Sequence, residues 1–388
     1  MKYASVFAFS LGLFLVGVAP AADSLNVRLV GSYDTPGMAL GVDVKGDYAY
    51  VADNFYGLRV ISVQDPAHPN EVGFYDTPGR AYGVVVVGSL AYVADRQTGL
   101  RVVSVTDPVN PAEVGYYDTP GYANDVAVVG EYAYIADGLS GLRIVSVADS
   151  AHPAEVGYYD TPGTAWGVAV SGNYAYVADG DSGLLVISVS DPAHPAEVGH
   201  LVTWGAALDV ALDETCAFVA ADTGGLRVIS VADPTKPQEV GHCDMLGNAY
   251  GVALDGIHAY VADLAFGLRV VSLSDVNEVG HYLSFVGAAW DVAVAGDYAY
   301  VANDTVGLQV LQFYDAGVEE SPKPQAPSRS SGPTVLSGAS GVERLASCVI
   351  FDAMGRRVAN PRSGVYFIRG EGRGAGDVGR TRKVIVQR

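Results

Sequence analysis

The feature that most constrains the fold is a tandem repeat of about 42 residues. The last residue of a segment resembling "YVAD" serves as its marker, and it falls at Asp53, Asp95, Asp137, Asp179, Asp222, Asp263 and Asn303. Successive markers are 42, 42, 42, 43, 41 and 40 residues apart. Such a period is typical of both β-propellers and helical arrays, so the residues inside the repeat must decide between them.

Each repeat contains four short runs rich in Val, Ile and Tyr. In the third repeat these runs are "YANDVAV", "EYAYIAD", "GLRIVSV" and "AEVGYYDT", and they are separated by Gly- and Pro-containing turns. Breaks this frequent exclude helices of useful length. Short strands that are apolar on both faces are expected where sheets pack face to face around an axis. The sequence therefore predicts an all-β, seven-bladed β-propeller at residues 22–314.

The strand count predicts how the ring closes. If the strands of a blade are called A to D from the inside outwards, seven A-B-C sets can be counted, but only six are followed by a D strand. The missing copy, "VRLVGSYDTPG", lies near the N-terminus at residues 27–37. We expect this segment to supply the outer strand of the last blade, because closure removes the free sheet edges of a linear array.

The repeats also resemble a known family. "GLRVISVQDPAHPNEVG" and its copies are similar to LVIVD repeats, a bacterial extracellular family, over roughly residues 27–314. The resemblance implies a propeller. It implies no particular activity, because the family has no established common one and a fold alone does not specify a function.

The N-terminus has the pattern of a signal peptide. "MK" is followed by the apolar run "YASVFAFSLGLFLVGV" and by "APA", a small-residue cleavage site. This pattern predicts export with removal of residues 1–21. A membrane anchor is the alternative, but the apolar run is short. No second apolar stretch of spanning length follows, so we expect no transmembrane span in the mature chain.

The C-terminus is predicted to be a separate unit. Residues 315–340 are rich in Pro, Ser and Gly and are typical of a flexible linker. Residues 341–388 resemble the C-terminal sorting domain of type IX secretion substrates, with matches at Asp352, Gly355, Arg356, Gly364, Tyr366, Arg369 and Lys383. This resemblance implies a small Ig-like β-domain, recognition by secretion machinery, and a secreted or outer-surface location in a Gram-negative bacterium. A degenerate remnant and a small capping domain are the alternatives.

The charge of the chain limits its partners. The formal net charge is −20, which makes nucleic acid and anionic lipid surfaces unfavourable partners. We instead expect a polar extracellular ligand or a protein partner.

Candidate binding residues are those that differ between repeats, because residues common to every blade serve the blade itself. The variable positions fall just before strand A and in the B–C loops, which should surround one mouth of the central channel. The candidates are Arg80, Tyr82, Tyr122, Asn124, Asp125, Trp166, Asp209, Tyr250, Trp290 and Asp291. Aromatic rings beside carboxylates suit a glycan, a peptide or another polar ligand. The alternative is that the aromatic residues wedge between blades and the carboxylates cap strand starts.

The sequence favours a non-catalytic binding module over an enzyme. It contains no GxSxG or HExxH motif and no cysteine–histidine pairing. His68, His152 and His194 occupy equivalent turns of separate blades and do not predict a shared metal site. One alternative is a metal-dependent hydrolase of the lactonase type, using Asn124, Asp125, Asp209 and Asp291, and another is a passive surface-layer component. No cofactor is predicted, with a structural calcium ion in the channel as the alternative.

Overall fold

A computed structural model describes residues 24–284 and 286–314, together with residues 335–337, 348–351, 364–370 and 381–387. The chain divides into two units, Met1–Val318 and Glu319–Arg388. The predicted signal peptide, residues 1–21, lies outside the described residues.

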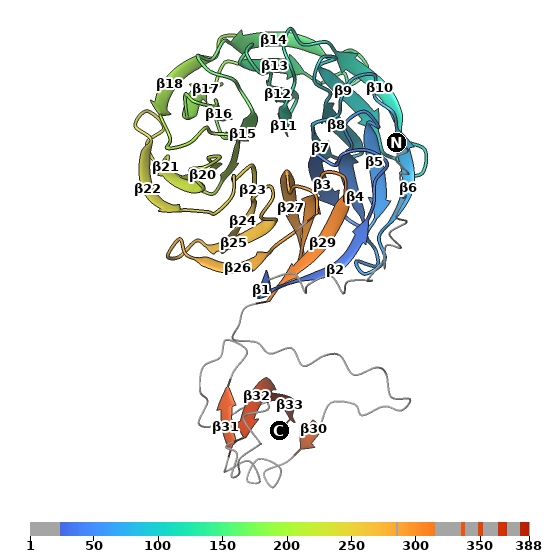
Figure 1. The fold of residues 1–388 in the computed structure, drawn as a ribbon, viewed down its shortest axis with the longest axis vertical. Coiled ribbons are helices and arrows are strands. Elements are labelled where there is room, and N and C mark those ends of the chain that lie inside the picture. The colour runs from blue at the N-terminus through green and yellow to red at the C-terminus, as the bar shows by residue number, and fades with distance from the viewer. Residues whose placement is uncertain are drawn as a thin grey trace, which may run out of the picture. The chain divides into compact units, whose positions relative to one another are not determined.

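The first unit is a ring of seven antiparallel sheets (Figure 1). Blades 1 to 3 consist of β3 (Gly41–Lys45), β4 (Tyr48–Ala52), β5 (Leu58–Ser62) and β6 (Asn70–Tyr75); β7 (Gly83–Val87), β8 (Leu90–Ala94), β9 (Leu100–Ser104) and β10 (Ala112–Tyr117); and β11 (Asp125–Val129), β12 (Tyr132–Ala136), β13 (Leu142–Ser146) and β14 (Ala154–Tyr159). In each blade the first strand is the innermost, as Figure 1 shows.

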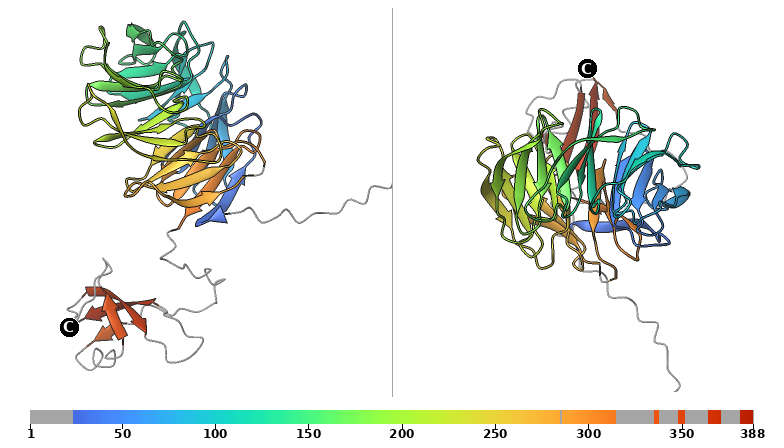
Figure 2. Two further views of the ribbon diagram at one scale, coloured as in Figure 1. Left: turned by 60° about the vertical axis from the view of Figure 1, so that its left-hand side comes forward. Right: turned by 90° about the horizontal axis from the view of Figure 1, so that it is seen from above.

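The remaining blades repeat this order. Blades 4 to 6 consist of β15 (Gly167–Ser171), β16 (Tyr174–Ala178), β17 (Leu184–Ser188) and β18 (Ala196–Leu201); β19 (Asp209–Leu212), β20 (Cys216–Ala220), β21 (Leu226–Ser230) and β22 (Gln238–Cys243); and β23 (Gly251–Leu254), β24 (His258–Ala262), β25 (Leu268–Ser272) and β26 (Glu278–Tyr282). Blade 7 contains β27 (Asp291–Ala295), β28 (Tyr298–Ala302) and β29 (Leu308–Phe313). Figure 2 gives two further views of the ring, in which the twist of the blades is visible.

The ring closes as the strand count predicted. The N-terminal strand β2 (Val27–Tyr33) pairs antiparallel with β29 and forms the outer strand of blade 7. A second contact was not predicted: β1 (Ser24–Leu25) adds a fifth strand to the outer edge of blade 6, against β26. Asn26 joins the two strands, and its side-chain amide donates a hydrogen bond of 2.8 Å to the carbonyl of Val279. The N-terminal segment therefore connects two neighbouring blades.

The core lies between the blades. Each apolar cluster joins two neighbouring sheets, as where Tyr50 and Leu58 of blade 1 pack with Val86 and Val93 of blade 2. Burial on both faces explains why the strands are almost continuously apolar.

The glycine of the repeated "EVG" segment recurs for a steric reason. The fourth strand of each of blades 1 to 6 carries an irregularity in its pairing, seen in blade 1 beside Gly73. A Cβ atom at Gly73 would collide with the carbonyl oxygens of Pro108 and Val109, in the turn of the next blade. Only glycine allows this approach, so its recurrence reflects packing between blades.

The described residues of the second unit form one four-stranded sheet. Its strands are β30 (Val335–Ser337), β31 (Cys348–Phe351), β32 (Gly364–Gly370) and β33 (Thr381–Gln387), in the order β30-β33-β32-β31. β30 pairs parallel with β33, and it falls inside the range predicted as a linker. Gly364, Tyr366 and Arg369 lie on β32 and Lys383 lies on β33. The other predicted sorting-motif residues, Asp352, Gly355 and Arg356, lie outside the described residues.

No helix in the part of the chain that the structure describes is long and apolar enough to cross a membrane.

Candidate functional site

One face of the ring is formed by the B–C and D–A loops, and we call it the mouth face. There the B–C loop of each blade forms a bridge with the segment that enters the next blade. Asn54 and Ala81 exchange two backbone hydrogen bonds, with N–O distances of 3.1 and 2.9 Å. The B–C residue at this position has a positive φ in every blade, as in Asn54 at 53°. These bridges link consecutive loops around the channel.

The marker aspartates hold the turns that lead into the inner strands. The carboxylate of Asp53 accepts hydrogen bonds from the hydroxyl of Thr35, at 2.7 Å, and the backbone N–H of Gly37, at 2.8 Å. It therefore caps the "TPG" turn. Its side chain is fully buried, and burial raises its pKa to about 6.

Asp222 does not occupy the position that the spacing suggested. The backbone hydrogen bond that Asp179 makes to Gly183 is made in blade 5 by Ala221 to Gly225. Asp222 instead takes the next position, with a φ of 48°. The sequence "FVAAD" therefore shifts the marker by one residue, and blade 5 lacks the buried carboxylate.

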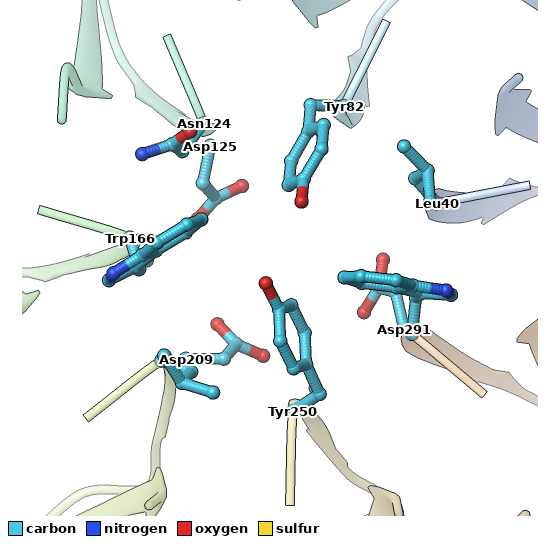
Figure 3. A pocket seen from close by; sticks show the side chains of 13 residues that line it. Leu40, Tyr82, Asn124, Asp125, Trp166, Asp209, Tyr250 and Asp291 are labelled. Carbon is cyan, nitrogen blue, oxygen red and sulfur yellow. The ribbon is translucent and has the colours of Figure 1, made fainter. Parts of the chain in front are cut away.

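A pocket of about 70 Å³ lies at the mouth of the channel. Eight of the ten candidate residues line it: Tyr82, Asn124, Asp125, Trp166, Asp209, Tyr250, Trp290 and Asp291. In Figure 3 the hydroxyls of Tyr82 and Tyr250 point toward each other from opposite sides. Residues from blades far apart in sequence thus meet around one small space.

The four aromatic residues of the pocket contact one another edge to face. The rings of Tyr250 and Trp290 lie 4.6 Å apart between centroids, Tyr82 and Trp290 6.3 Å, and Trp166 and Tyr250 6.5 Å. Edge-to-face pairs of this kind are attractive beyond the area that they bury. Burial and the neighbouring hydroxyl of Tyr82 raise the pKa of Tyr250, so this phenol stays neutral. The rings form a connected aromatic cluster across the channel mouth.

The three candidate aspartates join neighbouring inner strands. Asp291 accepts backbone hydrogen bonds from Val292, at 2.7 Å, and from Val42 of the next blade, at 2.9 Å. Asp125 and Asp209 bridge to Val168 and Val252 in the same way. Each carboxylate thus fixes the start of its own strand and the start of the following strand.

Burial and mutual repulsion raise the pKa values of these carboxyls. The pKa of Asp209 is raised to about 7, first by burial and then by the charge of Asp125. The pKa of Asp291 is also raised, by burial and then by Asp209. The three groups therefore share one electrostatic environment, although they come from blades 3, 5 and 7.

The odd number of blades explains one further aspartate that sequence reasoning missed. Asp and Gly alternate at the first position of the inner strands. A Cβ atom at Gly167 would lie 2.8 Å from the Cα atom of Asp209, so the small residue leaves room for the large neighbour. Strict alternation fails in a ring of seven, and blades 1 and 2 both carry glycine. Here Asp43, two residues further along β3, accepts hydrogen bonds from Val44 and Val86 at 2.7 and 2.6 Å.

Arg96 is a further residue of the mouth. Its guanidinium lies 4.5 Å from the ring centre of Tyr82 and 5.2 Å from that of Tyr122, and it donates a hydrogen bond to Asn124. Its φ of 52° is one that non-glycine residues adopt at a cost of about 1 kcal/mol. This residue connects the pocket to the outer rim of the mouth.

Two candidates do not line the pocket. Arg80 is exposed and stacks on the ring of Phe55, at 4.3 Å, and Tyr122 is half exposed beside Arg96. Both belong to the mouth face outside the channel.

The turn histidines are separate from the mouth. His68, His152 and His194 each form a hydrogen bond with the Asp three residues earlier, at 2.9 Å.

The mouth face also carries an apolar patch that the sequence analysis overlooked. The "TPG" turns of blades 1 to 4 are replaced later in the chain by "TWG", "MLG" and "FVG". Trp204, Leu246 and Val286 take the place of proline and are 73%, 79% and 68% exposed. Comparing the proline position between repeats would have revealed them. We call these three residues the apolar rim.

The pocket lining is mainly aromatic and polar. In the described part of the chain, no three His, Cys, Asp or Glu side chains gather closely enough to hold a metal ion. Asp125, Asp209 and Asp291, the obvious candidates to bind one, already accept backbone hydrogen bonds. The groups that remain available to a ligand are aromatic faces, tyrosine hydroxyls and the Arg96 side chain. The amide of Asn124 is buried, accepts from Arg96 and donates to the carbonyl of Ala165, at 2.8 Å.

Comparisons with known proteins agree with the fold. A family model described as "LVIVD repeat" matches residues 36–77, 78–119, 120–161, 162–203, 204–245, 246–283 and 286–311. No curated protein matches the sequence. Among solved structures, the chain is similar to the crystal structure of the computationally designed Ika8 protein, with a TM-score of 0.55 and 7% sequence identity over 74% of this chain and 100% of that one. Identity this low shows a shared fold alone.

Proposed function

The chain belongs to the LVIVD repeat family, and we propose that its propeller is a non-catalytic binding module whose ligand sits on the mouth face. One observation supports this most: residues that differ between otherwise uniform blades line one pocket. Blades that repeat almost without change elsewhere place tyrosine, tryptophan and asparagine side chains around this space. Packing alone needs no such variety, since equivalent positions in other blades hold Leu40 and Leu208.

The pocket size sets the kind of ligand. A volume of about 70 Å³ holds several water molecules or one end group, not a whole drug-sized ligand. We infer that one polar end of a glycan or peptide enters the pocket, while the rest lies across Arg80, Tyr122 and the apolar rim. Trp204 of the apolar rim is exposed, and the centre of its ring lies 5.3 Å from the guanidinium of Arg227. Such a ring is a suitable contact for a sugar or an aromatic side chain.

The double variant Trp166→Ala, Trp290→Ala tests this function. Loss of two stacking faces should weaken binding at least about five-fold, since one aromatic contact contributes about 1 kcal/mol. A glycan and peptide array identifies the ligand, and a titration of wild type and variant measures the change. The triple variant His68→Ala, His152→Ala, His194→Ala is the control and should bind normally. Normal binding by the tryptophan variant would show that the cluster only packs.

The array and an activity screen separate the other two hypotheses. A passive surface-layer component would bind nothing on it. A lactonase-type hydrolase would turn over lactone esters and depend on an added metal ion, which a screen with and without chelator detects.

The second unit is proposed to direct export. It forms a sheet of its own, and residues 341–388 carry ten Lys and Arg against four Asp and Glu, whereas the whole chain has a net charge of −20. A separate basic domain that follows an acidic domain in the chain suits recognition by secretion machinery at the outer membrane.

Deleting residues 341–388 in the native host tests this role. The propeller should still fold and should accumulate in the periplasm, as cell fractionation and detection of the chain would show. Normal amounts outside the cell would rule out the sorting role.

A further inference from the structure

The seam between blades 5 and 6 differs from the other seams of the ring. In five of them, the glycine of one outer strand faces the C–D turn of the next blade so closely that a Cβ atom would lie within 2.4 Å of a carbonyl oxygen. These pairs are Gly31 with Pro66, Gly73 with Pro108, Gly115 with Ser150, Gly157 with Pro192 and Gly199 with Pro234. At Gly241 of β22, the three nearest atoms would be side-chain carbons, the closest a methyl of Val276 at 3.2 Å.

The seam between blades 6 and 7 is covered in another way. The ring of Phe313 and the carbonyl oxygen of Leu25, in β1, would lie 2.8 and 3.1 Å from a Cβ atom at Gly280. Among the described blades, blade 5 is thus the one whose outer-strand glycine is not approached by a backbone.

A shortened turn in blade 6 causes this difference. The segment from the end of the third strand to the outer-strand glycine is "SVADPTKPQEVG" in blade 5 and "SLSDVNEVG" in blade 6, so three residues and both prolines are missing. The shortened turn is held by two backbone hydrogen bonds of 2.9 Å, from Val276 to Ser272 and from Ser272 to Asn277. It therefore stops short of the outer strand of blade 5.

A groove of about 460 Å³ lies in the space that the missing turn leaves, on the face opposite the mouth. Its volume is in the range of binding sites for small ligands or peptide segments. Val240 of β22 is 60% exposed there, against 37% and 36% for its counterparts Val114 and Val156. We call this space the seam groove, and its lining residues are Glu239, Val240, Gly241, His242, Asp275 and Val276.

The outer strand of blade 5 keeps the geometry that receives a proline turn in the regular seams. Between blades 4 and 5, the carbonyl of Pro234 would lie 2.4 Å and the ring of Pro237 3.0 Å from a Cβ atom at Gly199. Gly241 holds the same position on β22, beside the same irregularity of strand pairing. Its own chain no longer supplies the turn, yet the glycine still leaves room for a backbone to approach. The seam groove is thus open where a proline turn would sit.

The groove is acidic. Glu239 is already paired, since its carboxylate lies 3.5 Å from the guanidinium of Arg227 and 3.2 Å from the ring nitrogen of His242. Asp275 is exposed, and within the described residues it has no ion-pair partner. Hydrogen bonding to Asn277 lowers the pKa of Asp275, so this carboxylate is charged at neutral pH. The groove therefore favours a cationic group over an anionic one.

We propose that the seam groove binds a proline-containing turn of a partner protein that carries a lysine or arginine beside the proline. The proline carbonyl lies against Gly241, as in the regular seams, and the cation pairs with Asp275. A second copy of this chain is not the partner, because its proline turns already lie against the glycines of its own ring. The site is separate from the mouth pocket and does not depend on the function proposed for that face.

A cyclic peptide with the blade 5 turn sequence "ADPTKPQ" tests the ligand class, because ring closure preforms the turn. Fluorescence anisotropy of the labelled peptide, titrated with the full chain at low ionic strength, should show saturable binding that weakens with added salt. Replacing both prolines of the peptide by alanine should weaken binding at least about five-fold, since the turn then loses its preformed shape. Replacing its lysine by glutamate should also weaken binding about five-fold. No binding, or equal binding by all three peptides, would overturn the proposal.

Substitution of the glycine locates the site. Gly241→Ala places a Cβ atom where the proline carbonyl should lie, so it should weaken peptide binding at least about ten-fold. Its melting temperature should stay near that of the wild type, because only a valine methyl must move. Gly73→Ala is the matched comparison in a regular seam: its Cβ collides with backbone carbonyls, so it should lower the melting temperature and leave the peptide affinity of the folded protein unchanged. Wild-type affinity in Gly241→Ala would contradict the proposed position of the turn.

Two further changes test the charge and the shape of the groove. Asp275→Asn should lower the peptide affinity about five-fold, whereas Asp233→Asn, at the same position of the blade 5 turn, should not change it. A loop exchange that gives blade 6 the segment "VADPTKPQ" in place of "LSDVN" should fill the groove, raise the melting temperature and abolish peptide binding. Wild-type affinity in the exchanged protein would show that the peptide binds elsewhere and would overturn the proposal.

Discussion

At the scale of single residues, the charges around the buried marker residue differ from blade to blade. In blade 1 the Asp53 carboxylate lies 3.8 Å from the guanidinium of Arg59. Blade 4 has Leu185 where blade 1 has that arginine, so Asp179 is buried without it. Blade 7 is neutral throughout: the amide of Asn303 donates to Ser284, at 2.9 Å, and to Gln309, at 2.7 Å. One backbone geometry thus tolerates three charge arrangements.

This comparison predicts that replacing Asp by Asn changes the free energy of unfolding differently in blades 4 and 1. Asp179→Asn should change the free energy of unfolding by less than about 0.5 kcal/mol or should stabilise, because it removes a buried charge that lacks a counterion. Asp53→Asn should destabilise by about 2 kcal/mol, because Arg59 then loses a buried partner and keeps only Glu71 and the largely exposed Asp76.

Urea denaturation of both variants at neutral pH provides the measurement. Blade 7, with Asn303, shows that asparagine fits the position sterically. Equal losses in the two variants would mean that hydrogen bonding, and not charge balance, governs the site.

The sequence identified most pocket residues but not their contacts. Internal comparison of repeats found Asp125, Asp209 and Asp291, because the varying position is visible in the letters. Their bridging of adjacent strands depends on which backbone N–H groups face the channel, which requires the closed ring. Asp43 escaped notice for the same reason, since its role follows from an odd blade number.

At the scale of elements, the N-terminal segment joins two blades through β1 and β2. The prediction of β2 succeeded because the outer strand missing after blade 7 has an intact copy near the N-terminus. β1 could not be predicted in this way, because its two residues have no counterpart in any repeat. Its pairing depends on the fourth strand of blade 6 being close enough in space.

Deleting residues 26–36 should expose the edge of β29 and cause aggregation or a large loss of stability. Thermal unfolding followed with light scattering measures both effects. A chain that begins at Ser24 is the control and should unfold like the mature protein, since β1 and β2 are intact. An unchanged melting temperature after the deletion would contradict closure by β2.

At the scale of the whole molecule, buried carboxyls dominate the expected response to pH. Burial raises the pKa of Asp53 and Asp263 from 3.8 to about 6, and burial with repulsion raises that of Asp209 to about 7. An acid whose pKa is higher in the folded state binds more protons when folded. Its stabilising contribution is therefore complete below the unfolded pKa and is lost as the pH rises through the folded pKa.

The propeller should accordingly be most stable near pH 4 and lose stability as the pH rises from about 4 to 7. Each unit of pKa difference is equivalent to about 1.4 kcal/mol. Urea denaturation across this pH range measures the slope, and the slope should be shallower in Asp179→Asn, whose buried carboxyl also has a raised pKa. Stability that rises with pH over this range would contradict the assignment.

The architecture was predictable because the same order of strands and turns recurs in seven repeats. The wide part of the central channel was not predicted. It depends on the diameter that seven inner strands enclose, which does not appear in a single repeat.

The pairing of the two ends of the propeller also governs the order in which the molecule can be made. Arg28 and Gln312 are hydrogen-bonded across β2 and β29, yet they lie 284 positions apart in the chain. During synthesis the first strand must wait, unpaired, while six blades form from segments adjacent in sequence. Joining ends this distant is slow, because the entropy of loop closure must be overcome first. A nascent chain that stops before β29 keeps a free sheet edge at both ends, so only complete synthesis yields a ring without edges.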